Sequence, residues 1–233
     1  MKLLIVTFSL ILLSFSVSAQ NVIRYYNDSK VGYKNKFTNE IIVPPIYNAG
    51  SEMFGNYALI MVGSKRGYID DKGNVLIPPI YDDATQFFHG IASVKINGVY
   101  GFVNIKGEIV IPFDFTFASD FKNELARVEK DGKWGFIDST GVFIIPLQYI
   151  AAGDFSEGLA PIKNVKSKWG FIDVKGKIII PMKYDQAQSF LNGEALVTER
   201  DESIMINKNG RKIMEVEKPG EDEKEENERS FRK

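Results

Sequence analysis

The chain has 233 residues, with 29 Lys and Arg against 30 Asp and Glu, a single histidine and no cysteine. A formal net charge of -1 gives no electrostatic reason to expect a nucleic-acid partner. The lack of cysteine excludes a disulfide framework and a lipid attached through cysteine. One histidine, His89, is too few for a histidine-based metal site.

Residues 1–19 have the features of a secretory signal peptide. Lys2 supplies the positive start, residues 3–17 are largely apolar, and small residues at 17–19 precede a cleavage site ahead of Gln20. The apolar run is broken by Ser and Thr and is shorter than the roughly 20 residues that a membrane-spanning helix needs. The sequence therefore predicts export to the periplasm or secretion, with no membrane insertion after cleavage.

A repeat of about 34 residues organises the rest of the chain. A glycine recurs in steps of 35, 34, 34 and 35 residues, at Gly32, Gly67, Gly101, Gly135 and Gly170. An alanine keeps the same register at Ala58, Ala92, Ala126, Ala160 and Ala195, as expected where strands or units approach closely. We predict one array over residues 20–214, with units that start near residues 31, 66, 100, 134 and 169 and a partial capping unit near 203.

The unit at residues 131–146 predicts short strands and no helix. Residues 133–138 form a first strand, residues 138–141 a tight turn with Asp first and Gly last, and residues 159–163 a third strand. Residues 142–145 are apolar throughout, which predicts a second strand buried on both faces, and Pro146 is expected to end its pairing.

The expected fold is therefore an all-β tandem array of three-stranded units. An open spiral or solenoid is favoured, because propeller blades usually have four strands. A closed, propeller-like ring is the alternative. After the array, residues 215–233 contain eight acidic and five basic residues with one aromatic, a composition that predicts a disordered charged tail.

Two units carry a family resemblance. The segments 133–138 (KWGFID) and 168–173 (KWGFID), each followed by a turn glycine and a proline-ended apolar strand, resemble WG repeats, also called KWG repeats. The resemblance spans roughly residues 31–210 and loosens where Arg66, Tyr100 and Ser203 replace the tryptophan. It implies an all-β repeat from a family found mostly in bacterial proteins, many of them exported, that serves as an interaction module without a defined activity.

The acidic residues that recur before each turn glycine have two alternative interpretations: they bind a metal, or their side chains form the turn. Asp recurs before x-x-Gly at residues 70, 138 and 173, and Asn takes the same place at residues 104 and 207. Calcium needs several oxygens at one point, whereas these positions are a repeat apart. Exchange of Asp with Asn fits a turn-forming side chain, so we expect neither a metal nor a cofactor.

The tryptophan position is the candidate ligand-binding site. It holds Arg66, Tyr100, Trp134 and Trp169 in successive units, beside loops that differ between units. If the rings are partly exposed, they form a stepped stripe for an extended peptide or glycan. The alternative is that both tryptophans fill the gap between neighbouring units.

Two classes of function follow. The first is an exported, non-enzymatic β-repeat module that binds a protein or a cell-envelope glycan, with no catalytic residue. The second is a glycan-acting hydrolase that uses loop carboxylates such as Asp82, Asp83, Asp120 or Asp154 as acid and base. The first is preferred, because no catalytic motif is present. The sequence does not indicate an oligomeric state.

Overall fold

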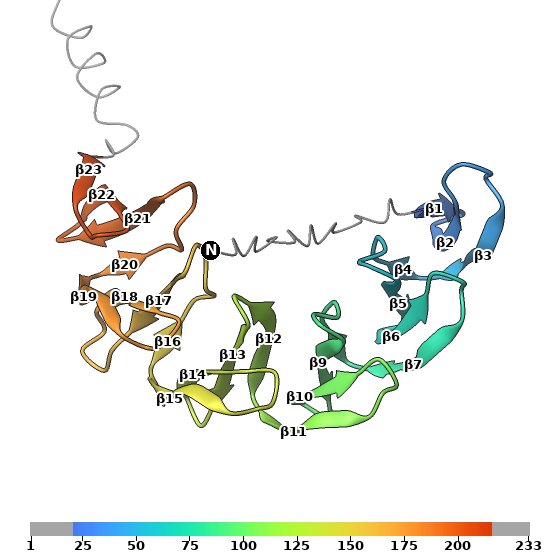
Figure 1. Cartoon of the computed structure of the whole chain (residues 1–233), viewed down its shortest axis with the longest axis horizontal. Coiled ribbons are helices and arrows are strands. Elements are labelled where there is room, and N and C mark those ends of the chain that lie inside the picture. Colours follow the sequence, from blue (N-terminus) through green and yellow to red (C-terminus); the bar gives the residue numbers. More distant parts are fainter. Residues whose placement is uncertain (1–20, 216–233) are drawn as a thin grey trace, which may run out of the picture.

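The computed structural model describes residues 21–215, which form strands, turns and loops without a helix. The strands make six small antiparallel sheets, which follow one another along an arc whose two ends stay apart (Figure 1). We number them sheet 1 (β1–β3), sheet 2 (β4–β7), sheet 3 (β8–β11), sheet 4 (β12–β15), sheet 5 (β16–β19) and sheet 6 (β20–β23). The predicted all-β tandem array and its open form are confirmed.

Residues 1–20 and 216–233 lie outside the described part of the chain, and with them the predicted signal peptide and nearly all of the predicted tail. Between residues 21 and 215 there is no helix, and hence none that is long and apolar enough to cross a membrane.

The predicted three-stranded unit is divided between two sheets: residues 133–138 and 142–145 correspond to β14 and β15 of sheet 4, whereas residues 159–163 form β17 of sheet 5. Five of the six sheets also have an unpredicted first strand, so that they contain four strands. The added first strands are β4 (Ala49–Gly50), β8 (Asp83–Ala84), β12 (Phe117–Lys122), β16 (Ala151–Ala152) and β20 (Gln186–Ala187). The second strands are β1 (Val22–Asn27), β5 (Tyr57–Val62), β9 (Ile91–Ile96), β13 (Leu125–Lys130), β17 (Leu159–Lys163) and β21 (Glu194–Glu199).

The remaining two strands complete each sheet. The third strands are β2 (Lys30–Asn35), β6 (Lys65–Asp70), β10 (Val99–Asn104), β14 (Lys133–Ile137), β18 (Trp169–Asp173) and β22 (Glu202–Asn207). The last strands are β3 (Ile41–Tyr47), β7 (Val75–Tyr81), β11 (Ile109–Phe115), β15 (Phe143–Tyr149), β19 (Ile178–Tyr184) and β23 (Lys212–Glu215). In Figure 1, β7, β11 and β15 lie on the outer rim of the arc, and β5, β9 and β13 lie nearer its inside.

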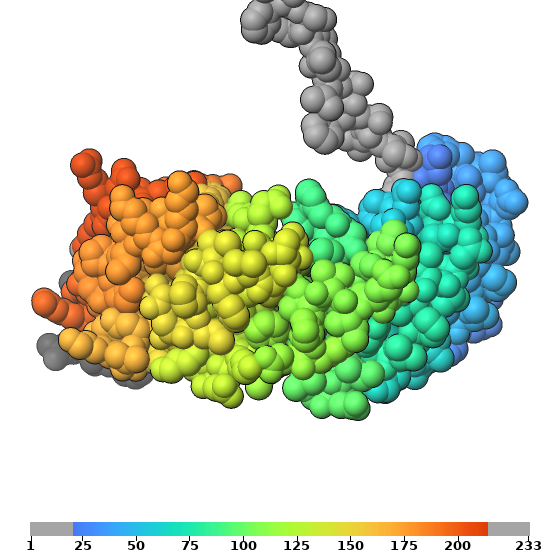
Figure 2. All heavy atoms as spheres, turned by 60° about the horizontal axis from the view of Figure 1, so that its bottom comes forward, coloured from blue at the N-terminus to red at the C-terminus, as the bar shows by residue number. Residues whose placement is uncertain are grey.

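A single residue joins each sheet to the next. The last strand of sheet 2 ends at Tyr81, and the first strand of sheet 3 begins at Asp83. The same one-residue link occurs at all five joints, at Asn48, Asp82, Thr116, Ile150 and Asp185. The sheets consequently follow one another as a continuous band in sequence order (Figure 2).

The expectation that residues 142–145 are buried on both faces is wrong. Ile145 is buried, whereas Val142, Phe143 and Ile144 are 57%, 42% and 40% exposed. The reason is position: β15 is the last strand of its sheet and pairs on one edge only.

Pairing also continues past Pro146, contrary to expectation. Ile145 pairs with Phe136 and Tyr149 pairs with Trp134, with a register shift between the two pairs. Such a bulge absorbs a residue that cannot donate a backbone hydrogen bond.

The bulge explains the glycine that marks each of the first five units. A Cβ on Gly135 would lie 2.6 Å from the carbonyl oxygen of Ile145, which is too close for any side chain. The equivalent distance is between 2.5 and 2.9 Å at the four other glycines of the series. The glycine is therefore required because the last strand crosses directly over it.

The predicted turn at residues 138–141 is confirmed. Gly141 has φ +85° and donates its N–H to the Asp138 carbonyl at 3.0 Å. The Asp138 carboxylate accepts hydrogen bonds from the N–H groups of Thr140 and Val142. Asn104 and Asn207 accept the same two bonds in their own turns, so the side chain at this position forms the turn.

Five hydrophobic cores lie between consecutive sheets. Each joins residues of both neighbours; between sheets 4 and 5, Phe136 and Ile145 meet Phe155, Ala160 and other residues of sheet 5. The alanine series is at most 1% exposed at all five positions, which confirms that it marks close approach. Each sheet is thus stabilised by packing between neighbours, as in other repeat arrays.

Candidate ligand-binding strip and pocket

The four candidate residues lie at the same end of their sheets. Each of them pairs with an aromatic residue of the last strand: Arg66 with Tyr81, Tyr100 with Phe115, Trp134 with Tyr149 and Trp169 with Tyr184. Tyr100 is buried, with 8% exposure, and the other three are half-buried. The tandem fold therefore gives all four the same local position.

Three of the four are joined through residues that the sequence analysis did not single out for this role. The Arg66 guanidinium pairs with the Asp83 carboxylate, and the Tyr100 hydroxyl donates to the same carboxylate at 2.7 Å. Ring centroids then lie 5.8 Å apart between Tyr100 and Phe117, and 5.2 Å between Phe117 and Trp134. We call this run, Arg66, Asp83, Tyr100, Phe117 and Trp134, the strip.

Asp83 and Phe117 belong to the first strands β8 and β12, and so place a side chain between those of neighbouring third strands. Burial, together with the hydrogen bond to Asp83, raises the pKa of Tyr100 to about 12. In sheet 5 this intermediate position is Ala151, and Trp169 lies beyond it. The small side chain of alanine leaves Trp169 outside the strip.

Cations cover the aromatic rings. The Arg127 guanidinium lies 5.0 Å from the ring centroid of Phe117 and 4.9 Å from that of Trp134. Lys95 and Lys163 lie 5.2 and 5.8 Å from the rings of Tyr100 and Trp169. Contacts of this kind stabilise the rings where they are.

Arg127 also ties sheet 4 to sheet 5. Its guanidinium donates to the carbonyl of Ala152, and its Nε lies 3.0 Å from Asp154 Oδ1 without hydrogen-bond alignment. Burial lowers the pKa of Arg127, and the Asp154 carboxylate opposes that change. Arg24 makes the same two contacts from sheet 1 to sheet 2, with Gly50 and Glu52.

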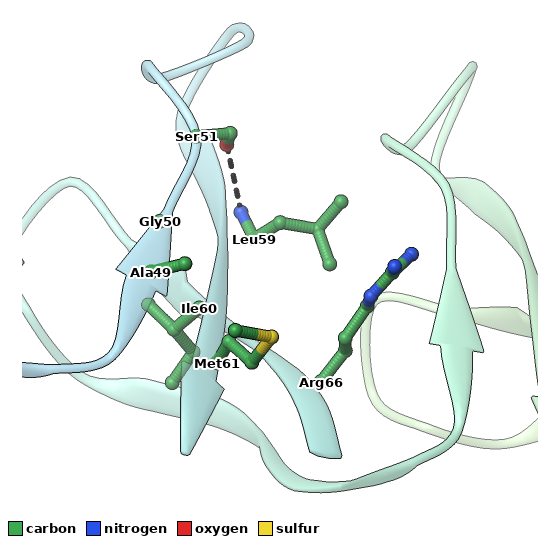
Figure 3. Close-up of a pocket in the computed structure, with 7 residues that line it drawn as sticks. All are labelled: Ala49, Gly50, Ser51, Leu59, Ile60, Met61 and Arg66. Atoms are coloured by element: carbon green, nitrogen blue, oxygen red, sulfur yellow. Dashed lines mark hydrogen bonds between the residues drawn. The ribbon is translucent and has the colours of Figure 1, made fainter. Parts of the chain in front are cut away.

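Sheet 2, like sheets 3, 5 and 6, has no arginine at this position, and a pocket of about 300 Å³ lies beside it. Ala49 stands where sheet 4 has Phe117, and Leu59 stands where it has Arg127, so two large side chains are missing. Figure 3 shows Ala49, Leu59 and Met61 pointing to the side on which Arg66 lies; the full lining is Ala49, Gly50, Ser51, Leu59, Ile60, Met61 and Arg66. Of the four predicted residues, Arg66 is the one that lines this pocket.

The carboxylates considered for hydrolysis are all ion-paired. Asp82 pairs with Lys65, Asp83 with Arg66, Asp120 with Lys122, and Asp154 with Arg127. The hydrogen bond from Lys65 lowers the pKa of Asp82. None of the four acids lines the pocket beside Arg66. In the described part of the chain, no group of three or more His, Cys, Asp or Glu side chains is placed to hold a metal ion.

Taken together, the geometry defines a tandem β-repeat array with a half-buried strip along one side and one pocket beside it. The family described as WG containing repeat matches residues 32–65, 67–100, 100–134, 134–168 and 169–201. The chain therefore belongs to the WG repeat family. Among curated proteins, none matches it.

The solved structures that match the chain share little sequence with it. A eukaryotic initiation factor is 9% identical over 84% of this chain and 73% of that chain, with a TM-score of 0.50. BamB from Moraxella catarrhalis is 11% identical over 85% and 73%, with a TM-score of 0.46. The WD40 β propeller domain of Doa1 is 10% identical over 87% and 81%, with a TM-score of 0.38. At these identities a likeness concerns the fold alone.

Proposed function

We propose that the chain is a non-enzymatic interaction module whose partner, a protein or a cell-envelope polymer, inserts a side group into the pocket beside Arg66. The observation that carries this proposal is the departure of sheet 2 from the packing of sheet 4. Ala49 and Leu59 leave space where Phe117 and Arg127 fill it. A pocket with a mostly apolar lining and one charged group is typical of ligand sites.

The state of the carboxylates supports a non-enzymatic role. A glycoside hydrolase needs one carboxylic acid with a raised pKa and a second carboxylate close by. The hydrogen bond from Lys65 lowers the pKa of Asp82, which is the wrong direction for a general acid, and Asp83, Asp120 and Asp154 are each ion-paired with an Arg or Lys.

The test is to fill the pocket with the side chain that sheet 4 already uses. Ala49→Phe introduces the residue found at Phe117, and Leu59→Arg introduces the one found at Arg127. Ala151→Phe is the matched control, because it makes the same change at the same position of sheet 5. A partner is first captured with the wild type from envelope extract. We expect Ala49→Phe to weaken its binding at least tenfold, which is about 1.4 kcal/mol of binding free energy or more, and Ala151→Phe to leave binding unchanged.

If both fillings leave capture unchanged while circular dichroism shows the folded array, the pocket is not the binding site. A hydrolytic activity on cell-wall glycan that disappears on changing Asp120 or Asp154 to Asn would instead favour the enzymatic alternative.

We further propose that the module acts outside the cytoplasm, because residues 1–19 have the composition of a signal peptide. Fractionation of cells that express the full chain, with and without residues 1–19, tests this. Export requires that only the longer form reaches the periplasm or medium and that its N-terminus there begins at Gln20.

A further inference from the structure

The two ends of the array present faces that are covered at every other sheet. Each core between neighbouring sheets combines one face of a sheet with the opposite face of the sheet that follows it. Among the described residues, sheet 1 has no sheet before it and sheet 6 has none after it, because the two ends of the arc stay apart (Figure 1). One face of each end sheet is therefore without a neighbour.

In sheet 1 this face contains Ile23, Tyr25 and Lys34, which we call the leading face. Ile23 pairs with Lys34 across β1 and β2, as Ala58 pairs with Ile69 in sheet 2, so the positions are equivalent. In sheets 2 to 6 the three positions hold Ala, then Ile or Val, then Ile or Val, and all fifteen side chains are at most 1% exposed. In sheet 1 all three are half-buried.

In sheet 6 the face without a neighbour contains Glu194 and Met205, which we call the trailing face. Glu194 begins the second strand, where sheets 4 and 5 have Leu125 and Leu159 in the core shared with the next sheet. Met205 stands where the five other sheets have a ring of 0% exposure, at Tyr33, Tyr68, Phe102, Phe136 and Phe171. Glu194 is exposed and Met205 is half-buried.

The five internal joints show which of these positions meet. In every core, the first residue of one sheet's second strand lies with an Ile or Val of the next sheet's third strand. The pairs are Val22 with Ile69, Tyr57 with Val103, Ile91 with Ile137, Leu125 with Ile172, and Leu159 with Ile206. A joint of the same kind between sheet 6 and sheet 1 would place Glu194 against Lys34, which have opposite charges.

The apolar positions of the two faces also suit each other. In the core between sheets 4 and 5, Phe136 lies with Ala160 and Ile162. The equivalent contact joins Met205 to Ile23 and Tyr25. Methionine is unbranched and adapts to a neighbour larger than alanine, and its sulfur makes favourable contacts with an aromatic ring.

The charges of Glu194 and Lys34 are not neutralised within residues 21–215, since neither side chain is in an ion pair there. Lys34 Nζ donates to the neutral amide oxygen of Asn39 at 3.0 Å. A cap that only keeps an array soluble needs a polar outer face. Here each face combines one charge with apolar side chains, and the two charges are opposite, as a contact between the faces requires.

We propose that the array binds a second copy of this chain end to end, with the trailing face of one copy against the leading face of the next. Such a contact is heterologous, so it continues into a filament or closes into a ring. The proposal does not use the pocket beside Arg66, and it can hold or fail independently of the proposed function.

The test is sedimentation velocity of the full chain over a range of concentrations. We expect the mean mass of the wild type to rise above that of a monomer as the concentration increases. Lys34→Glu and Glu194→Lys each place like charges across the contact, which should weaken association at least tenfold. Lys72→Glu and Glu124→Lys are the matched controls, because they make the same charge changes at exposed positions outside both faces, and they should associate as the wild type does.

The two variants that disrupt the contact should restore it when they are mixed. In the mixture, Lys34→Glu of one chain meets Glu194→Lys of the other, and the unchanged Lys34 and Glu194 meet in the next contact. The double variant Lys34→Glu/Glu194→Lys should likewise associate by itself. All variants keep residues 1–19, so association through that apolar segment would not respond to these changes.

A wild type that stays monomeric at every concentration would overturn the proposal. Association that neither charge change weakens would also overturn it, because the contact would then lie on another surface. The same holds if the mixture and the double variant both stay dissociated while circular dichroism shows that the variants are folded.

Discussion

The first two joints between sheets differ from the last three at one position of the third strand. Tyr33 and Tyr68 occupy it in sheets 1 and 2, and their hydroxyls donate to the carbonyls of Ser51 and Thr85 in the next sheet, at 2.9 and 2.7 Å. In sheets 3, 4 and 5 the position is a phenylalanine, at Phe102, Phe136 and Phe171. All five rings have 0% exposure.

The shared feature is a buried ring. Phe136 meets Phe155 with centroids 4.8 Å apart, and Tyr68 meets Phe87 at 4.3 Å. The tyrosine hydroxyl adds a hydrogen bond at the first two joints, and the last three joints form without one. We infer that ring burial holds the sheets together, and that the hydrogen bond is a smaller, local addition.

The largest expected effect comes from removing a ring. Phe136→Ala should lower the free energy of unfolding by about 3–5 kcal/mol, because it deletes a fully buried ring and leaves a cavity between sheets 4 and 5. Urea unfolding followed by tryptophan fluorescence measures it. A loss below about 1 kcal/mol would mean that ring burial is not what holds this joint.

Removing only the hydroxyl should cost less. Tyr68→Phe keeps the ring and leaves the Thr85 carbonyl without its donor, which we expect to cost about 1–3 kcal/mol. Tyr26→Phe, at a tyrosine that is 62% exposed, is the control and should stay within about 0.5 kcal/mol of the wild type. If Tyr68→Phe is as neutral as the control, the two kinds of joint do not differ in energy.

The smallest effect is a dependence on alkaline pH. Burial raises the pKa of Tyr33 and Tyr68 above the ordinary value of 10.0. Because the folded pKa lies above the unfolded one, the resulting stability is fully present below pH 10.0 and is lost as the pH rises through and beyond that value. The melting temperature of the wild type should therefore fall between pH 9 and pH 11.5, and less steeply in a variant that carries Phe at residues 33 and 68.

Tyr100, whose pKa is raised to about 12, and Tyr47, Tyr81 and Tyr149, whose pKa values burial also raises, are present in both proteins and form the common background. An identical fall in the two proteins would show that the tyrosine joints contribute nothing to the pH response.

Much of the fold followed from the repeat itself. The glycine, alanine and turn positions of one unit constrain all others, because each sheet packs only on its neighbours. The turn at residues 138–141 could be predicted because Asp and Gly have local conformational reasons to be there. The exposure of Val142, Phe143 and Ile144 could not be predicted, because apolar composition does not distinguish an outer strand from an inner one.

The two-residue strands also lie beyond sequence reasoning. Ala49–Gly50 is too short to show any alternation, and its pairing with β5 depends on where the preceding strand ends. The candidate residues Arg66, Tyr100 and Trp134 were found from their shared register. Ala49 and Leu59, which complete the pocket, were missed because their contribution is the space left by a small or uncharged side chain. Comparing each position between units, Ala49 with Phe117 and Leu59 with Arg127, is the signal that would have found them.

The one-residue links between sheets have a mechanical consequence. A single residue such as Asp82 spans at most about 3.6 Å, so two sheets cannot move apart without unpairing a strand. The array therefore has a fixed pitch, and equivalent side chains of successive sheets are held at preset separations. A partner that contacts two sheets at once makes its second contact with no further ordering of this chain. Its avidity depends on how well the distance between its two contacting groups matches the pitch of the array.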